Sequence, residues 1–150
     1  MPSPSGADVS LVEAFVEFAQ TGTAESFSQL PLADSVDLGL GPQIELTVEA
    51  DDLQSPSSWV IDAELFRAYV GPFSALMLLE QADDFVVRVG PHPHCVSSPQ
   101  PAPKGLDDHT RLSIQPSDDS IDSCLKWWTV DFFVGPSGLV EAITLDVYEP

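Results

Sequence analysis

Lysine and arginine are nearly missing from this chain, which has only five of them against 24 aspartates and glutamates. The net charge is −19, and twelve of the acidic residues precede the first cation, Arg67. Nucleic acids and anionic membranes bind proteins through lysine and arginine, so this composition argues against both as partners. The same charge favours a basic protein as the partner.

The sequence also has no long apolar run and no secretory signal. Its start, MPSPSGADVS, lacks a basic segment followed by an apolar one, and the most apolar stretch, 73–79, is too short to span a bilayer. We therefore expect a cytoplasmic location. There the two cysteines, Cys95 and Cys124, would be reduced thiols, whereas a disulfide between them is the alternative for a secreted chain.

Apolar residues are plentiful enough to form a core. They make up 43% of the 150 positions, which argues against disorder and for a single domain. We expect residues 1–7 to be a disordered tail and residues 8–150 to form one α+β domain. Five prolines predict that residues 90–108 form a loop within it.

Three segments carry helix signals. Ser10 and Glu13 match a capping box at the start of a helix that Gly22 would end. A short helix is predicted over 24–30, since a proline follows it. A third helix is predicted over 73–81, after a Gly-Pro pair, and its nearly continuous apolar surface predicts deep burial.

Alternating apolar and polar residues predict the strands. These segments are 36–40, 44–48, 85–89, 111–115, 124–134 and 139–148. A Gly-Pro-Ser-Gly turn joins the last two into a long β-hairpin. The order of elements predicts an α+β fold, with an antiparallel sheet of about six strands, three helices packed on one face and a long β-hairpin at the end.

This layout resembles the NTF2-like (SnoaL-type) cone fold, which has early helices, a middle helix and a final curved hairpin. The matching segments are 11–19, 32–36, 71–81 and 133–148, so the resemblance covers most of the chain and rests on the layout of elements. The proline-rich stretch after Val89 departs from the family pattern and would lie near the mouth of the cone. The resemblance implies a pocket that binds a ligand or carries acid–base chemistry.

Asp131 is the candidate catalytic residue because it lies in the middle of an apolar strand. Trp128, Val130 and Phe132 are expected to face the core, which places Asp131 on the opposite face. If that face lines a concave pocket, Asp131 is a plausible general base. If the face meets water, Asp131 is a solubilising carboxylate.

Trp127 and Phe133 are the candidate binding residues. Adjacent tryptophans in a strand place one indole on each side of a sheet, and Trp127 shares its side with Phe133. An exposed aromatic patch among acidic residues would anchor a basic partner while the charges steer its approach. A helix or loop that covers the two rings is the alternative.

All histidines and cysteines of the chain lie between residues 92 and 124. Such residues bind zinc, but there is no CxxC pair, and extended prolines would turn Cys95 away from the neighbouring histidines. We therefore expect no metal and no cofactor. A cysteine–histidine nucleophile is a further hypothesis. The candidate metal ligands are His92, His94, His109 and Cys124.

Three functions are consistent with the sequence. The first is a small acidic binding protein without enzymatic activity, an immunity- or inhibitor-type module for a basic partner. The second is an NTF2-like pocket protein, a ligand binder or an acid–base enzyme with Asp131 in the pocket. The third is a domain adapted to a salty solvent, with no activity that the sequence indicates.

Overall fold

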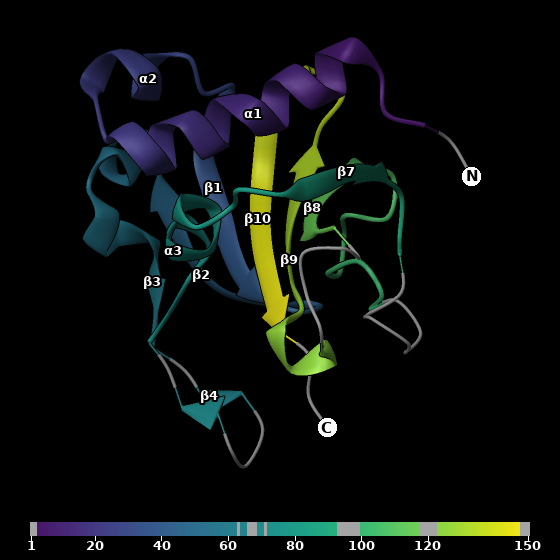
Figure 1. The fold of residues 1–150 in the computed structure, drawn as a ribbon. Coiled ribbons are helices and arrows are strands. Elements are labelled where there is room, and N and C mark those ends of the chain that lie inside the picture. Colours follow the sequence, from purple (N-terminus) through teal and green to yellow (C-terminus); the bar gives the residue numbers. More distant parts are fainter. Residues whose placement is uncertain are drawn as a thin grey trace.

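A six-stranded sheet forms the centre of the molecule, and two helices, α1 (Gly6–Thr21) and α3 (Ala75–Glu80), lie against one of its faces (Figure 1). The computed structural model describes residues 3–62, 64–65, 69–70, 72–92, 100–117 and 123–147. The arrangement confirms the predicted α+β class. No helix in this described part of the chain is long and apolar enough to cross a membrane.

The strand order is β2-β1-β10-β9-β8-β7, so β2 and β7 are the edges. Their bounds are β1 (Leu32–Leu40), β2 (Gln43–Glu49), β7 (Phe85–Val89), β8 (Thr110–Pro116), β9 (Trp128–Val134) and β10 (Val140–Val147). Four neighbouring pairs are antiparallel, but β1 and β10 are parallel, so the prediction of an antiparallel sheet was wrong for this pair. Alternation identifies a strand without giving its partner's direction, and the long intervening chain lets β10 return alongside β1.

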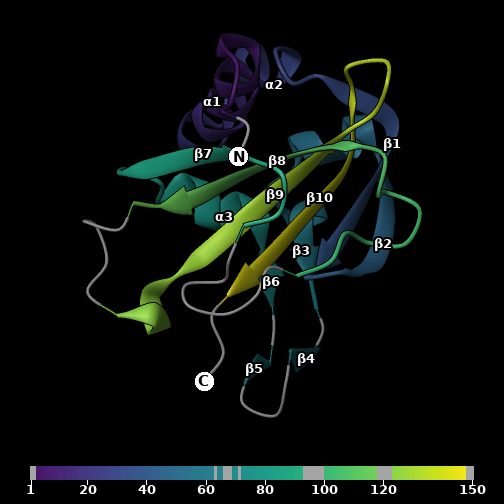
Figure 2. The ribbon, with the colours of Figure 1, turned by 90° about the vertical axis from the view of Figure 1, so that its right-hand side faces the viewer.

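Smaller elements complete the chain. Strands β3 (Val60–Ile61) and β6 (Phe73–Ser74) pair, as do β4 (Glu64–Leu65) and β5 (Tyr69–Val70). Figure 2 shows the β4–β5 pair extending below the main sheet. Within the described residues, the 3-10 helices are η1 (Ala50–Gln54), η2 (Pro56–Trp59) and η4 (Cys124–Lys126).

Helix α1 begins earlier than the sequence predicted. Its N-cap is Ser5, whose hydroxyl accepts a hydrogen bond from the Asp8 amide while the Asp8 carboxylate accepts one from the Ser5 amide. The capping box is therefore Ser5 with Asp8 and not Ser10 with Glu13, and the predicted tail of residues 1–7 is wrong from Ser5 onward. The predicted end is confirmed, because Gly22 is left-handed with φ 66° and donates its amide to the Phe18 carbonyl.

The other two helices are short. Helix α2 (Ala24–Ser28) confirms the predicted second helix. Helix α3 starts at Ala75, not at Phe73, because Phe73 and Ser74 pair with β3 as strand β6 and the Ser74 hydroxyl caps the helix at the Met77 amide. The prediction that the whole helix is deeply buried was also wrong, since Met77 is 63% exposed.

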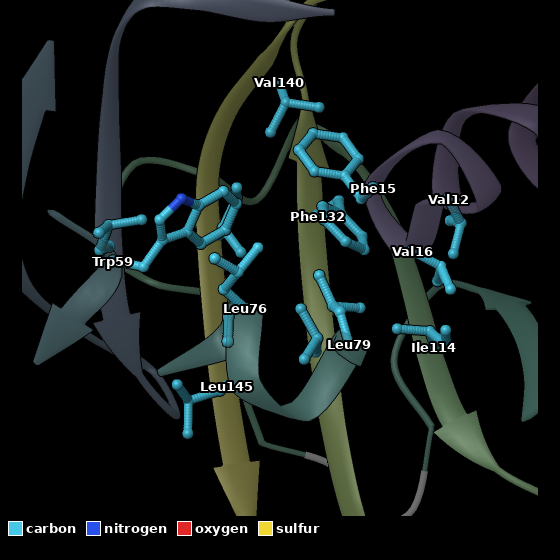
Figure 3. Close-up of a cluster of buried hydrophobic side chains, with 14 of the residues drawn as sticks. Val12, Phe15, Val16, Trp59, Leu76, Leu79, Ile114, Phe132, Val140 and Leu145 are labelled. Carbon is cyan, nitrogen blue, oxygen red and sulfur yellow. The ribbon is translucent and has the colours of Figure 1, made fainter. Parts of the chain in front are cut away.

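The core lies between α1, α3 and the sheet (Figure 3). Phe15 of α1 stacks on Phe132 of β9 with ring centroids 4.5 Å apart. Trp59 of η2 closes the core beside β10, where its indole Nε1 donates a hydrogen bond to the Leu53 carbonyl at 2.7 Å. Trp128, Val130 and Phe132 belong to this core cluster, as the sequence predicted.

Candidate functional site

The second face of the sheet is buried over its central strands and is largely polar, although the apolar Phe133 and Ala142 also lie on it. Asp131 on β9 lies opposite Ser113 on β8 and Thr144 on β10, and all three are buried. Buried polar side chains are expensive unless they bond one another. The polar side chains of this face are Arg111, Ser113, Gln115, Thr129, Asp131, Thr144 and Asp146.

An ion pair between Arg111 and Asp131 is the central contact of this face. The Nη2 and Nε atoms of Arg111 donate to the same carboxylate oxygen, Oδ2 of Asp131, at 2.7 and 3.1 Å. The other oxygen, Oδ1, accepts a hydrogen bond from the Thr129 hydroxyl at 2.9 Å. The side chains of Arg111 and Asp131 are only 13% and 6% exposed, so water screens their attraction little.

The pair lies diagonally across β8 and β9. Arg111 is in register with Phe133, two residues beyond Asp131, so the guanidinium reaches back along the face to the carboxylate. The carbon at the centre of the guanidinium lies 5.5 Å from the centroid of the Phe133 ring, a cation–π distance. The Nη1 atom donates to the backbone carbonyl of Gln100 at 2.9 Å, which ties β8 to the proline-rich loop.

A pocket of about 550 Å³ opens beside this pair, between the ends of β7 and β8 and the loop that crosses them. Arg111 and Phe133 form part of its wall, and His109 and Asp107 contribute further polar groups. The volume is in the range of small-molecule sites, and Asp131 itself is not among the lining residues. The apolar lining residues are Val89, Pro91, Pro101, Ala102, Leu106 and Phe133.

His109 is held between two carboxylates at the rim of the pocket. Its Nδ1 lies 3.0 Å from Asp108 and its Nε2 lies 3.2 Å from Glu141, while its side chain is only 10% exposed. The register of β9 and β10 shifts between Val140 and Ala142, so Glu141 lies at an irregularity that can re-aim a side chain. A Cβ atom at Gly135 would overlap the Glu141 carboxylate, so a larger residue there would displace this end of the Glu141 side chain.

The two carboxylates raise the pKa of His109. Burial by itself lowers the pKa of His109, but the carboxylates of Glu141 and Asp108 outweigh it, so the pKa is raised above the ordinary 6.5. The charged ring then has an acceptor beside each nitrogen. Nδ1 hydrogen-bonds with Asp108, whereas the contact between Nε2 and Glu141 has an ion-pair distance but not the geometry of a hydrogen bond.

The pKa of His92 is shifted in the opposite direction. Burial lowers the pKa of His92 below its ordinary value, and the hydrogen bond with the Val89 carbonyl, at 3.1 Å, only partly offsets it. Nearby Arg88 and Arg111 lower this pKa further. The pKa values of the two described histidines are therefore shifted in opposite directions, upward for His109 and downward for His92.

The candidate binding residues are both buried. Trp127 and Phe133 are 5% and 0% exposed, so the prediction of an exposed aromatic patch was wrong and the alternative, covered rings, is confirmed. Phe133 still touches the pocket, where its ring forms part of the wall. Trp127 lies outside the core cluster that contains Trp128, but it is the C-cap of η4 and precedes β9, so the predicted strand over 124–134 begins only at Trp128.

The candidate metal ligands are not assembled within the described residues. No group of three or more histidine, cysteine, aspartate or glutamate side chains there has a geometry that could hold a metal ion. Cys124 is disulfide-bonded, so the expectation of a reduced thiol was wrong at this position, and Cys124 offers no thiolate to a metal or a substrate. His94 and the chain's other cysteine, Cys95, lie outside the described residues.

Several residues of the site escaped the sequence analysis. Arg111 was only counted as a cation, Glu141 as an acid and Gln100 as part of a loop, because their contacts depend on strand register and loop path. One signal was available: Arg111, Ser113 and Gln115 alternate with apolar residues, as Thr129 and Asp131 do. Polar alternation on two central strands indicates a polar buried face.

Comparisons with protein-family models, with curated proteins and with solved structures found no match to this chain. The function must therefore be argued from the site itself.

Proposed function

We propose that this chain is a small-molecule binding protein and that the pocket beside Arg111 is its ligand site. One observation carries the proposal: a pocket of about 550 Å³ combines mostly apolar walls with a largely buried guanidinium. Ligand sites have this composition, in which apolar surface provides affinity and a few polar groups fix orientation. The proposal agrees with the pocket that a resemblance to the NTF2-like fold implies, and that resemblance stays a prediction.

Binding fits the geometry better than acid–base catalysis. Both oxygens of Asp131 accept hydrogen bonds, from Arg111 and Thr129, and the carboxylate does not line the pocket. Each nitrogen of His109 faces a carboxylate. A general base must be within reach of the proton that it abstracts, so we assign Asp131 the role of a positioning residue that holds Arg111.

A fragment screen followed by protein NMR tests this proposal. We expect aromatic fragments to shift the amide resonances of Leu106, Thr110 and Arg111, which line or adjoin the pocket. The variant Ala102→Trp fills the pocket and should abolish these shifts, while Ala7→Trp, at an exposed position of α1, should leave them unchanged. Shifts that survive in Ala102→Trp, or that occur only elsewhere, would contradict the proposal.

A second candidate function, an acidic binding module for a basic partner, has one specific feature in its favour. A groove between α1 and the start of β7 has Val16 and Phe85 among its apolar lining and Glu13, Glu17 and Asp83 as its acidic residues. Its carboxylates belong to α1 and to the turn before β7, so they can steer a cationic segment towards it. The buried Trp127 and Phe133 can no longer supply the exposed aromatic anchor.

A matched pair of variants separates the groove from the general charge. Glu13→Gln with Glu17→Gln and Glu45→Gln with Glu49→Gln each remove two charges, the first in the groove and the second on the edge strand β2. If the groove binds a lysine-rich peptide, the first pair should weaken the affinity about tenfold and the second should not. Equal effects would mean that only net charge attracts the peptide.

A further inference from the structure

Arg111 has more donors than the protein uses. A guanidinium carries five N–H groups, and the structure shows acceptors for three of them, two at Asp131 and one at the Gln100 carbonyl. The described residues supply no acceptor for the other two, one on Nη1 and one on Nη2. Because the side chain is 13% exposed and lines the pocket, these donors are the groups that a bound molecule meets.

The position of Arg111 is fixed before any ligand arrives. Its paired donation to one oxygen of Asp131, the carbonyl of Gln100 and the ring of Phe133 hold the guanidinium from three sides. A donor that is already oriented loses little entropy when it binds an acceptor. An unbonded charged donor in a buried site is unfavourable, and an acceptor on the ligand would remove that cost.

The charge around the pocket opposes an anionic ligand. Asp131 already balances Arg111, and His109 is flanked by two carboxylates. The acidic side chains that line the pocket or contact its basic lining residues are Asp107, Asp108, Asp131 and Glu141. Four carboxylates thus face two cations here, in a chain of net charge −19, so a carboxylate or phosphate on the ligand would be repelled.

We infer that the pocket takes an uncharged, ring-bearing ligand whose carbonyl or carboxamide oxygen accepts hydrogen bonds from Arg111. This inference rests on the proposed function and adds the chemical class of the ligand. The apolar wall of Val89, Pro101, Leu106 and Phe133 packs against the ring. The oxygen reaches the two remaining donors without bringing a negative charge towards the surrounding carboxylates.

Three probes of one ring system test the class: naphthamide, naphthoate and methylnaphthalene. They present a neutral acceptor, an anionic acceptor and no acceptor, and their dissociation constants are measured by NMR titration of the pocket resonances. We expect naphthamide to bind about tenfold or more tightly than either of the others, the ratio that one hydrogen bond to a charged group supplies. This comparison needs only the unmodified chain.

A double variant, Arg111→Met with Asp131→Leu, removes both charges together, so that neither is left buried and unpaired. In this variant the advantage of naphthamide over methylnaphthalene should disappear while the hydrocarbon still binds. Tightest binding of naphthoate, or equal binding of all three probes to the unmodified chain, would overturn the inferred class and leave the ligand site standing. Failure of all three to perturb the pocket would overturn the proposed function as well.

Discussion

At the scale of single residues, the pair between Arg111 and Asp131 is the most deeply buried ion pair that the described residues form. Both charges are removed from water, and each is bonded further, to Gln100 and to Thr129. Such pairs contribute little net stability relative to apolar residues. The loss of one partner, however, leaves the other charge buried and unpaired, which is strongly destabilising. The role that we assign to Asp131 is therefore to fix the orientation of the Arg111 guanidinium at the wall of the pocket.

We predict that Asp131→Asn lowers the free energy of unfolding by about 3 kcal/mol, because a largely buried guanidinium loses its counter-charge. Urea unfolding measures the change. Glu45→Gln is the control, since Glu45 is exposed on the edge strand β2, and it should change stability by no more than about 0.5 kcal/mol. Equal effects of the two variants would show that the ion pair is not structurally important.

His109 and His92 should give the fold opposite dependences on pH. The pKa of His109 is raised, so its contribution is fully present below about pH 6.5 and is lost as the pH rises through the folded pKa. The pKa of His92 is lowered, so its contribution is present above about pH 6.5 and is lost as the pH falls through the folded pKa.

The variants His109→Gln and His92→Gln test these signs by unfolding between about pH 5.5 and 8.5. Relative to the unmodified chain, we expect His109→Gln to be most destabilised at the acidic end and to converge with it as the pH rises. His92→Gln should gain relative stability as the pH falls. The same slope for both variants would show that the carboxylates Asp108 and Glu141 do not govern His109.

At the scale of elements, α1 packs against the rest of the fold through a buried apolar stripe of valines and phenylalanines. Phe15 is fully buried against Phe132, and Phe18 packs against Phe27 of α2 at 5.2 Å between ring centroids. Helix α1 carries no basic residue in its last turn, so electrostatics stabilise its end little. Tertiary packing therefore provides most of its stability.

We predict that Phe15→Ala lowers the free energy of unfolding by about 3–5 kcal/mol through lost burial and the cavity that it leaves. Met77→Ala on α3 serves as the comparison because Met77 is 63% exposed, and its effect should stay within about 0.5 kcal/mol. Chemical denaturation with an unchanged slope would assign both changes to the native state. A small effect of Phe15→Ala would show that the contact between α1 and β9 contributes little to the stability of the core.

At the scale of the whole molecule, the net charge of −19 should make stability depend on salt. Raising the ionic strength from about 0.01 M to 0.15 M shortens the Debye length from about 30 to 8 Å and screens the repulsion among exposed carboxylates. We therefore predict a melting temperature that rises over this range. Glu45→Gln with Glu49→Gln should raise it at low salt and less at high salt, whereas a flat response of the unmodified chain would contradict surface repulsion.

The sequence by itself determined the local elements and the sides of the strands. Gly22 ends α1 because glycine adopts the left-handed conformation readily, and Trp128 faces the core because side chains alternate along a strand. Asp131 was placed on the correct face for the same reason. These features depend only on residues that are close in the sequence. The periodicity of apolar residues and the residues at helix ends therefore predict them without a structure.

Only the tertiary structure decided the parallel pairing of β1 with β10, the start of α3 and the partners of Asp131. Direction and register depend on which strands meet, and nothing within a strand encodes its neighbour. Arg111 and Asp131 are 20 residues apart in the chain, and the pairing of β8 with β9 brings them within hydrogen-bonding distance. The pocket exists because that contact, the proline-rich loop and the ends of β7 and β8 converge in space.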